Sequence, residues 1–189
     1  SSVMSPREPM AGEAGSDVRG EFIDMHGDRY YAIRNVHNMA PFFVSVVSAD
    51  DHWLFVSSTG GITAGRVSPE TALFPYETVD RLHLAANDAG PKTIVRVNDA
   101  SGQRVWEPFN TEHRKRYAIR RNLYKNTLGN KLCLEEINDD LGLTFRYTWS
   151  TSEEFGFVRD CEMRNVGADT AEIEVLDGLQ NVLPAGTPR

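Results

Sequence analysis

Adjacent carboxylates are the side chains of this sequence best suited by type to acid–base chemistry. The candidate pairs are Glu135 with Glu136, Asp139 with Asp140, and Glu153 with Glu154. A general acid and a general base must both reach the same substrate. Successive side chains of a strand point to opposite faces of a sheet, so Glu135 and Glu136 are predicted to face apart. Asp139 and Asp140 are expected in a turn, where aspartates accept hydrogen bonds from backbone amides. We therefore predict no catalytic residue in these pairs.

The histidines and cysteines have none of the spacings typical of metal sites. The five histidines are His26, His37, His52, His83 and His113. They form no HxH or HExxH pattern, and Cys133 and Cys161 belong to no CxxC motif. We predict neither a metal site nor a cofactor. Two interpretations of the cysteines remain open, namely buried free thiols and a disulfide between neighbouring strands.

The segment SSTGGITAGRVSPETALFPYETVDR, residues 57–81, contains three glycines and two arginines and lacks a strand period. It has neither the GxxxxGK[ST] spacing of a P-loop nor the GxGxxG spacing of a dinucleotide site. Backbone amides at Gly60, Gly61 and Gly65, together with the Arg66 guanidinium, are still suited to an anion or to several hydroxyls. A tight structural turn is the alternative. Either way, we predict a long loop excursion at 57–91.

Composition limits the class of protein. The 189 residues are 40% hydrophobic and 25% charged, with a net charge of −7, which is typical of a soluble globular chain. No apolar run approaches the roughly 20 residues of a membrane helix, and the acidic balance favours no nucleic-acid partner. A local basic cluster is expected to be solvated or paired with carboxylates; it comprises Arg114, Lys115, Arg116, Arg120 and Arg121. Residues 1–20 are predicted to be a flexible lead-in before one domain at 21–189.

The elements that position these residues are predicted to be strands. LTFRYTWS (143–150) alternates Leu143, Phe145, Tyr147 and Trp149 on one face with Thr144, Arg146, Thr148 and Ser150 on the other. Nine further strand candidates lie at 30–35, 42–48, 53–58, 92–98, 104–109, 116–122, 132–138, 155–165 and 171–177. The pattern predicts an all-β fold, an antiparallel two-layer β-sandwich.

Three blocks carry a resemblance to a known family: TGGITAGRVSPETALFPYETVDRL, RNLYKNTLGNKLCLEEINDDLGLTFRYTWSTSEEFGFVRDCEMRNVG and EVLDGLQNVLP. From about Tyr30 to Pro184 the chain resembles the N-terminal region of large bacterial proteins described as cellobiose phosphorylase-like. The resemblance implies a galactose-mutarotase-like supersandwich, incomplete in this chain. In that family a helical (α/α)6 barrel follows and carries the catalytic carboxylates. The implied partners are a carbohydrate and a helical catalytic domain or chain, in an oligomer of the bacterial cytoplasm or periplasm.

Sugar recognition needs aromatic faces for stacking and planar polar groups for hydroxyls. The residues predicted to bind substrate or to dock another domain are Thr63, Arg66, Glu70, Tyr76, Arg81, Trp53, Gln180 and Asn181. Trp149 is expected in the core, whereas Trp53 and Trp106 fit either core or surface. The resulting hypothesis is a noncatalytic sandwich portion of a glycoside hydrolase or phosphorylase. A stand-alone carbohydrate-binding module and a structural or oligomerisation domain remain alternatives.

Overall fold

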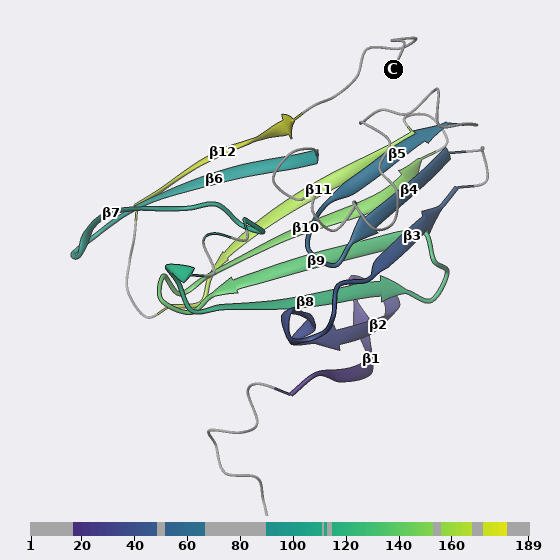
Figure 1. Ribbon diagram of the computed structural model, residues 1–189, viewed down its shortest axis with the longest axis horizontal. Helices are drawn as coiled ribbons and strands as arrows, with labels where there is room; N and C mark the ends of the chain where they lie inside the picture. The colour runs from purple at the N-terminus through teal and green to yellow at the C-terminus, as the bar shows by residue number, and fades with distance from the viewer. Residues whose placement is uncertain are drawn as a thin grey trace, which may run out of the picture.

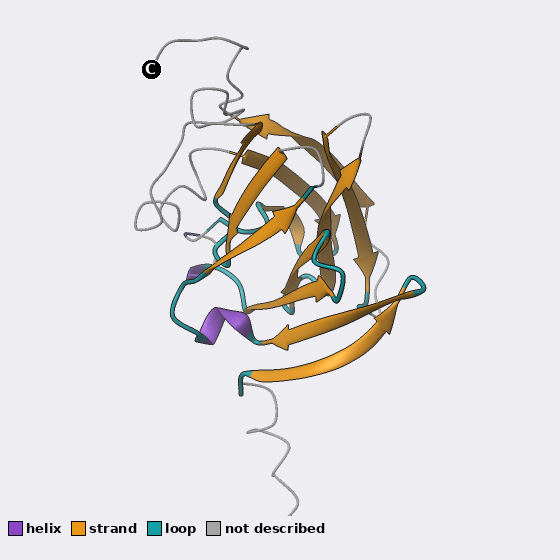
Figure 2. Cartoon of the chain, turned by 90° about the vertical axis from the view of Figure 1, so that its right-hand side faces the viewer, coloured by secondary structure: helices purple, strands orange, loops and turns teal. Residues whose placement is uncertain are grey.

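The computed structural model describes residues 17–48, 52–66, 90–110, 112, 115–152, 156–167 and 172–180. These residues form twelve strands and the short 3-10 helix η1 (Val36–Asn38) (Figures 1 and 2). Every strand pair is antiparallel. The predicted all-β sandwich is therefore confirmed. No helix in the described part of the chain is long and apolar enough to cross a membrane.

The strands form one large sheet and two small ones. The large sheet has the order β1 (Arg19–Met25), β2 (Asp28–Arg34), β8 (Ile119–Asn126), β9 (Lys131–Asn138), β10 (Leu143–Ser152) and β11 (Gly156–Asn165). One small sheet has the order β12 (Glu172–Gln180), β6 (Gly90–Asp99) and β7 (Gly102–Trp106). The other has the order β3 (Phe43–Val47), β4 (His52–Ser57) and β5 (Ile62–Arg66). Figure 1 shows the two small sheets beside one another along the large sheet.

The hydrophobic core lies between the large sheet and the two small ones. Apolar side chains of all three sheets contact one another there, for example Leu54 of β4, Val95 of β6 and Phe145 of β10. The alternation predicted for β10 is confirmed, because its apolar set is buried, including Trp149 at 5% exposure. Trp106, for which the sequence allowed either a core or a surface position, is fully buried. The opposite face of β10 therefore carries its polar set, and the same face of the large sheet also holds a small apolar cluster of Tyr30, Ala32, Tyr124 and Cys133.

Ten of the strands overlap the segments predicted from alternation, whereas β1 and β5 were missed. β1 begins at Arg19, inside the last two residues of the expected lead-in. β5 corrects the expected loop at 57–91: residues 57–66 form a hairpin turn and a strand, while residues 67–89 lie outside the described part of the chain. Gly60 has φ +101 in this turn, where Ser57 N donates to Gly61 O at 2.7 Å. The sequence of β5 has little alternation of apolar and polar residues. The strand is stabilised by the burial of Ile62 and Ala64 and by its pairing with β4.

The predicted turn between β9 and β10 is confirmed. Asp140 Oδ2 accepts a hydrogen bond from Ala118 N at 2.8 Å, and Asn138 Oδ1 accepts one from Leu141 N at 3.0 Å. The turn ends at Gly142, whose φ is +64. Its carbonyl oxygen accepts hydrogen bonds from the amides of Val166 and Gly167 at 2.8 and 3.0 Å. This glycine therefore joins the β9–β10 turn to the end of β11.

Gly142→Ala is expected to lower the free energy of unfolding by about 2 kcal/mol, because the positive φ and a close contact both oppose a side chain. A Cβ at this position would lie 2.8 Å from Gly167 Cα and 3.1 Å from Gly167 N. Gly129→Ala is the matched control, since Gly129 has φ +75 and its nearest neighbour would be Lys125 Cε at 4.0 Å. Urea denaturation followed by tryptophan fluorescence measures both losses. Equal losses in the two variants would contradict the contact argument.

The two cysteines are free thiols. Cys133 of β9 and Cys161 of β11 lie on strands that β10 separates, so they are not cross-strand neighbours. The disulfide alternative is therefore wrong, and the free-thiol alternative is correct. Cys133 is buried as expected, whereas Cys161 is exposed. Burial raises the pKa of the Cys133 thiol to about 11, which keeps it protonated at neutral pH.

Candidate functional site on the polar face of the large sheet

Only part of the predicted sugar-binding set lies in the described residues. Trp53 of β4 packs against Phe55, with ring centroids 5.7 Å apart. The backbone of Trp53 lies opposite Gly65 of β5, and that of Thr63 lies opposite Phe55. The argument for Arg66 assumed a loop, but its backbone lies opposite His52 in a regular strand pair. Gln180 ends β12 in the other small sheet. The other four predicted residues lie outside the described part of the chain: Glu70, Tyr76, Arg81 and Asn181.

The richest arrangement of polar side chains lies instead on the face of the large sheet that is turned away from the core, here called the polar face. The strand register aligns its residues in rows across β8, β9, β10 and β11. One row consists of Asn122, Glu135, Arg146 and Glu162, and the next consists of Tyr124, Cys133, Thr148 and Asp160. Directly opposed side chains in such rows lie close enough to bond to one another.

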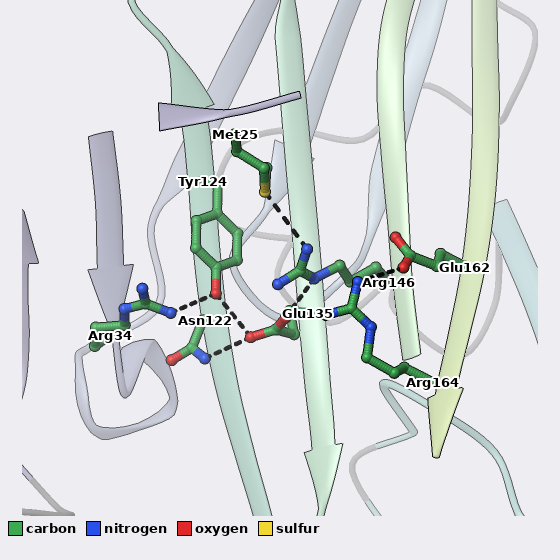
Figure 3. A network of polar contacts seen from close by, with 8 residues as sticks. All are labelled: Met25, Arg34, Asn122, Tyr124, Glu135, Arg146, Glu162 and Arg164. Carbon is green, nitrogen blue, oxygen red and sulfur yellow. Dashed lines mark hydrogen bonds and ion pairs between the residues drawn. The ribbon is translucent and has the colours of Figure 1, made fainter. Parts of the chain in front are cut away.

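Glu135 is the centre of a hydrogen-bonded network on this face (Figure 3). The carboxylate is 3% exposed and accepts hydrogen bonds from Asn122 Nδ2 at 2.7 Å and from Tyr124 Oη at 2.8 Å. Its other oxygen pairs with Arg146 Nε. Arg34 Nη1 donates to Tyr124 Oη at 2.6 Å, which extends the network to β2. The neighbours of β9, which are β8 on one side and β10 on the other, thus supply the donors for the buried Glu135 carboxylate.

The network also fixes the two arginines. Their guanidinium carbons lie 5.1 Å (Arg34) and 5.3 Å (Arg146) from the centroid of the Tyr124 ring, within the range of cation–π attraction. Arg146 Nη1 donates to Met25 Sδ at 3.4 Å, which connects the network to the end of β1. A planar guanidinium held by several partners loses little further freedom when it binds a ligand.

Glu135 is ionised at neutral pH. Burial alone would raise the pKa of this carboxyl group, but the hydrogen bonds from Asn122 and Tyr124 and the charge of Arg146 outweigh burial and lower it. Burial and the neighbouring Glu135 raise the pKa of Tyr124. Neither group therefore changes its protonation near pH 7. The network is a fixed arrangement of charges, unsuited to shuttling a proton.

Glu136 points into the core, as the alternation predicted. Its Oε1 pairs with Arg121 Nε at 2.7 Å, and its Oε2 accepts hydrogen bonds from Trp106 Nε1 at 2.9 Å and from Phe109 N at 3.0 Å. The side chains of this ion pair are 3% (Arg121) and 1% (Glu136) exposed. Glu135 and Glu136 thus lie on opposite faces and have separate structural partners. They cannot act on one substrate.

Three described members of the basic cluster, Lys115, Arg120 and Arg121, are paired with carboxylates. Arg120 binds Asp139 through two nitrogens at 2.8 and 2.7 Å, and Lys115 Nζ lies 3.2 Å from Glu112 Oε2. Arg121 is the buried partner of Glu136. These pairs agree with the interpretation of the cluster as carboxylate-paired.

A groove of about 250 Å³, here called the polar groove, lies on the polar face beside the Glu135 network. Residues of β9, β10 and β11 line it, together with residues of the end of β1, the β1–β2 turn and β2. The lining residues are Met25, His26, Tyr30, Lys131, Cys133, Arg146, Thr148, Ser150, Asp160, Cys161 and Glu162. Hydroxyl, carboxylate and cationic groups thus converge on one hollow.

The alternation of apolar and polar residues in β10 was the sequence feature that could have indicated this site. It placed Arg146, Thr148 and Ser150 together on the outward face, and all three line the polar groove. Tyr30 and Asp160 were missed because they come from β2 and β11, more than a hundred residues apart in the sequence. Only the pairing of distant strands brings them to the same hollow.

No group of three histidine, cysteine or acidic side chains in the described residues is placed to hold a metal ion. No family model and no curated protein matches the chain.

Proposed function

We propose that this chain is the noncatalytic β-sandwich portion of a carbohydrate-active enzyme of the glycoside hydrolase or phosphorylase type. The observation that carries the proposal is the polar face, where hydroxyl, carboxylate and guanidinium groups are held in fixed positions around the ionised Glu135. Sugars are recognised by such planar and hydroxyl groups, because each sugar hydroxyl both donates and accepts hydrogen bonds. The resemblance to cellobiose phosphorylase-like proteins supports the same class of ligand.

The role proposed for the chain is to bind and position, and the catalytic acids belong to a helical domain or chain that docks on it. Glycosidases need carboxyl groups about 5 to 9.5 Å apart across the sugar, or a single acid where phosphate is the nucleophile. Glu135 and Glu136 are held on opposite sides of the sheet, and Asp139 and Asp140 have structural partners in a turn. These four acids are therefore not available for the reaction.

The test is the composition and activity of the native species purified from its source. We expect a species larger than the 21.2 kDa of this chain, containing a helical catalytic part. The purified species is expected to cleave cellobiose or a related glycoside, whereas the 189-residue chain alone does not. Assays with and without inorganic phosphate distinguish phosphorolysis from hydrolysis. A native species of 21.2 kDa without such activity would overturn the proposal in favour of a binding or structural module.

A further inference from the structure

The polar groove exists because short side chains occupy the middle of the polar face. Cys133, Thr148 and Asp160 lie opposite one another on three adjacent strands, and Ser150 follows on β10. Longer side chains from the neighbouring positions, such as Lys131 and Arg146, surround this row and form the walls. The hollow is therefore built into the register of the strands and does not depend on a loop.

Most charged groups around the groove already have partners. Lys131 Nζ lies 2.6 Å from Asp28 Oδ2, and Arg146 pairs with Glu135. Glu162 Oε1 accepts a hydrogen bond from Arg164 Nη2 at 2.7 Å. Asp160 differs from them, because its exposed carboxylate makes no hydrogen bond or ion pair with any residue that the structure describes.

This pattern of pairing decides the charge of the ligand. With the cations neutralised by their partners, the one uncompensated charge among the described residues that line the groove is the negative charge of Asp160. Anions such as phosphate are repelled by a carboxylate that has no adjacent free cation. A neutral ligand with hydroxyl groups satisfies Asp160 as a hydrogen-bond acceptor without adding charge. Hydroxyls of Tyr30, Thr148 and Ser150 complete the polar lining.

The size of the groove limits the length of the ligand. Pockets for drug-sized molecules measure about 300–1,000 Å³, and this groove, at about 250 Å³, is smaller. One sugar ring fits this scale, and a longer glycan would have to leave the groove through its open side. Met25 and the ring of Tyr30 supply apolar surface for the carbon atoms of the sugar.

We propose that the polar groove binds a single neutral sugar residue, with the Asp160 carboxylate accepting hydrogen bonds from adjacent sugar hydroxyls and Thr148 and Ser150 completing the contacts. This inference rests on the proposed function, because it assigns a ligand and a site to the same polar face. It adds that recognition is local to β9, β10 and β11 and that charged sugars are disfavoured.

The test uses the ¹⁵N-labelled chain titrated with D-glucose as the probe and followed by amide chemical shifts. We expect saturable shifts that concentrate at Cys133, Thr148, Asp160 and their neighbours. Asp160→Asn is expected to weaken glucose binding about tenfold, because a neutral amide with one accepting oxygen replaces a charged carboxylate with two. Glu172→Gln is the matched control: it removes an exposed carboxylate from β12, outside the groove, and is expected to leave the affinity unchanged.

Inorganic phosphate and glucose 6-phosphate test the charge argument. Tighter binding of either anion at the same amides would overturn the assignment of a neutral ligand, and so would unchanged glucose affinity in Asp160→Asn. Absence of glucose binding would overturn the groove site while leaving the proposed function intact if the native species is a larger, active enzyme. Glucose binding by a native species of only 21.2 kDa would instead support the groove and contradict the proposed function.

Discussion

Replacing Glu136 with alanine is expected to lower the free energy of unfolding by about 4 kcal/mol, the largest loss predicted for this protein. The substitution leaves the Arg121 guanidinium, which is only 3% exposed, without a counter-ion. It also removes the acceptor for Trp106 Nε1 and for the backbone amide of Phe109. A buried charge and two buried donors would then all lack partners. Urea denaturation at pH 7, followed by tryptophan fluorescence and by far-UV circular dichroism, measures the loss.

Two further variants separate the charge of Glu136 from its hydrogen bonds. Glu136→Gln keeps an oxygen that accepts hydrogen bonds from Trp106 and Phe109 but leaves Arg121 unpaired, so an intermediate loss is expected. The double variant Arg121→Met with Glu136→Leu removes both charges and is expected to be more stable than Glu136→Ala, because a buried ion pair is often replaceable by apolar side chains. If the double variant were less stable than Glu136→Ala, the uncompensated charge would not be the cause.

The sequence was sufficient to predict that Glu135 and Glu136 point to opposite faces of the sheet, but not which residues they contact. The period of two in β9 and β10 assigns each side chain to a face, and the structure confirms this for Glu135, Glu136 and Trp149. Strands with a clear alternation of apolar and polar residues were predicted correctly. β5 was missed because its sequence ITAGR has small residues and no such alternation. β1 was missed for a similar reason, since RGEFIDM exposes Phe22 at 59% and depends on its pairing with β2.

The candidate site was harder to predict because it depends on contacts between distant strands. Arg34 and Tyr124 are ninety residues apart, yet they share a hydrogen bond on the polar face. No local sequence pattern indicates that Tyr124 is a partner of Glu135. The adjacent acids Glu135 and Glu136 resemble a catalytic pair in the sequence, but each has a separate structural role. The glycines of residues 57–81 suggested a loop that binds a ligand. Residues 62–66 instead form a strand in which Arg66 lies opposite His52.

Replacing Glu135 with alanine is expected to lower the free energy of unfolding by about 3 kcal/mol at pH 7, less than the loss for Glu136. Asn122, Tyr124 and Arg146 all lose their acceptor, but the Arg146 side chain is 20% exposed and can bind water. The loss is expected to be accompanied by weaker sugar binding in the polar groove, because Arg146 forms part of its wall. Denaturation in urea gives the first effect, and the glucose titration gives the second.

The dependence of stability on pH tests whether the charge of Glu135 is the stabilising feature. The folded-state pKa of Glu135 is lowered below its ordinary value of 4.5, so its ionised form stabilises the fold above that value. This contribution is lost as the pH falls through the lowered pKa. The stability difference between the wild-type chain and Glu135→Gln is therefore expected to be constant from pH 7 to about pH 5 and to shrink at lower pH. Asp99 and Asp177 also have lowered pKa values, but they are present in both proteins and cancel in the difference. A difference that stayed constant down to pH 2 would show that the shape of the side chain, and not its charge, holds the network together.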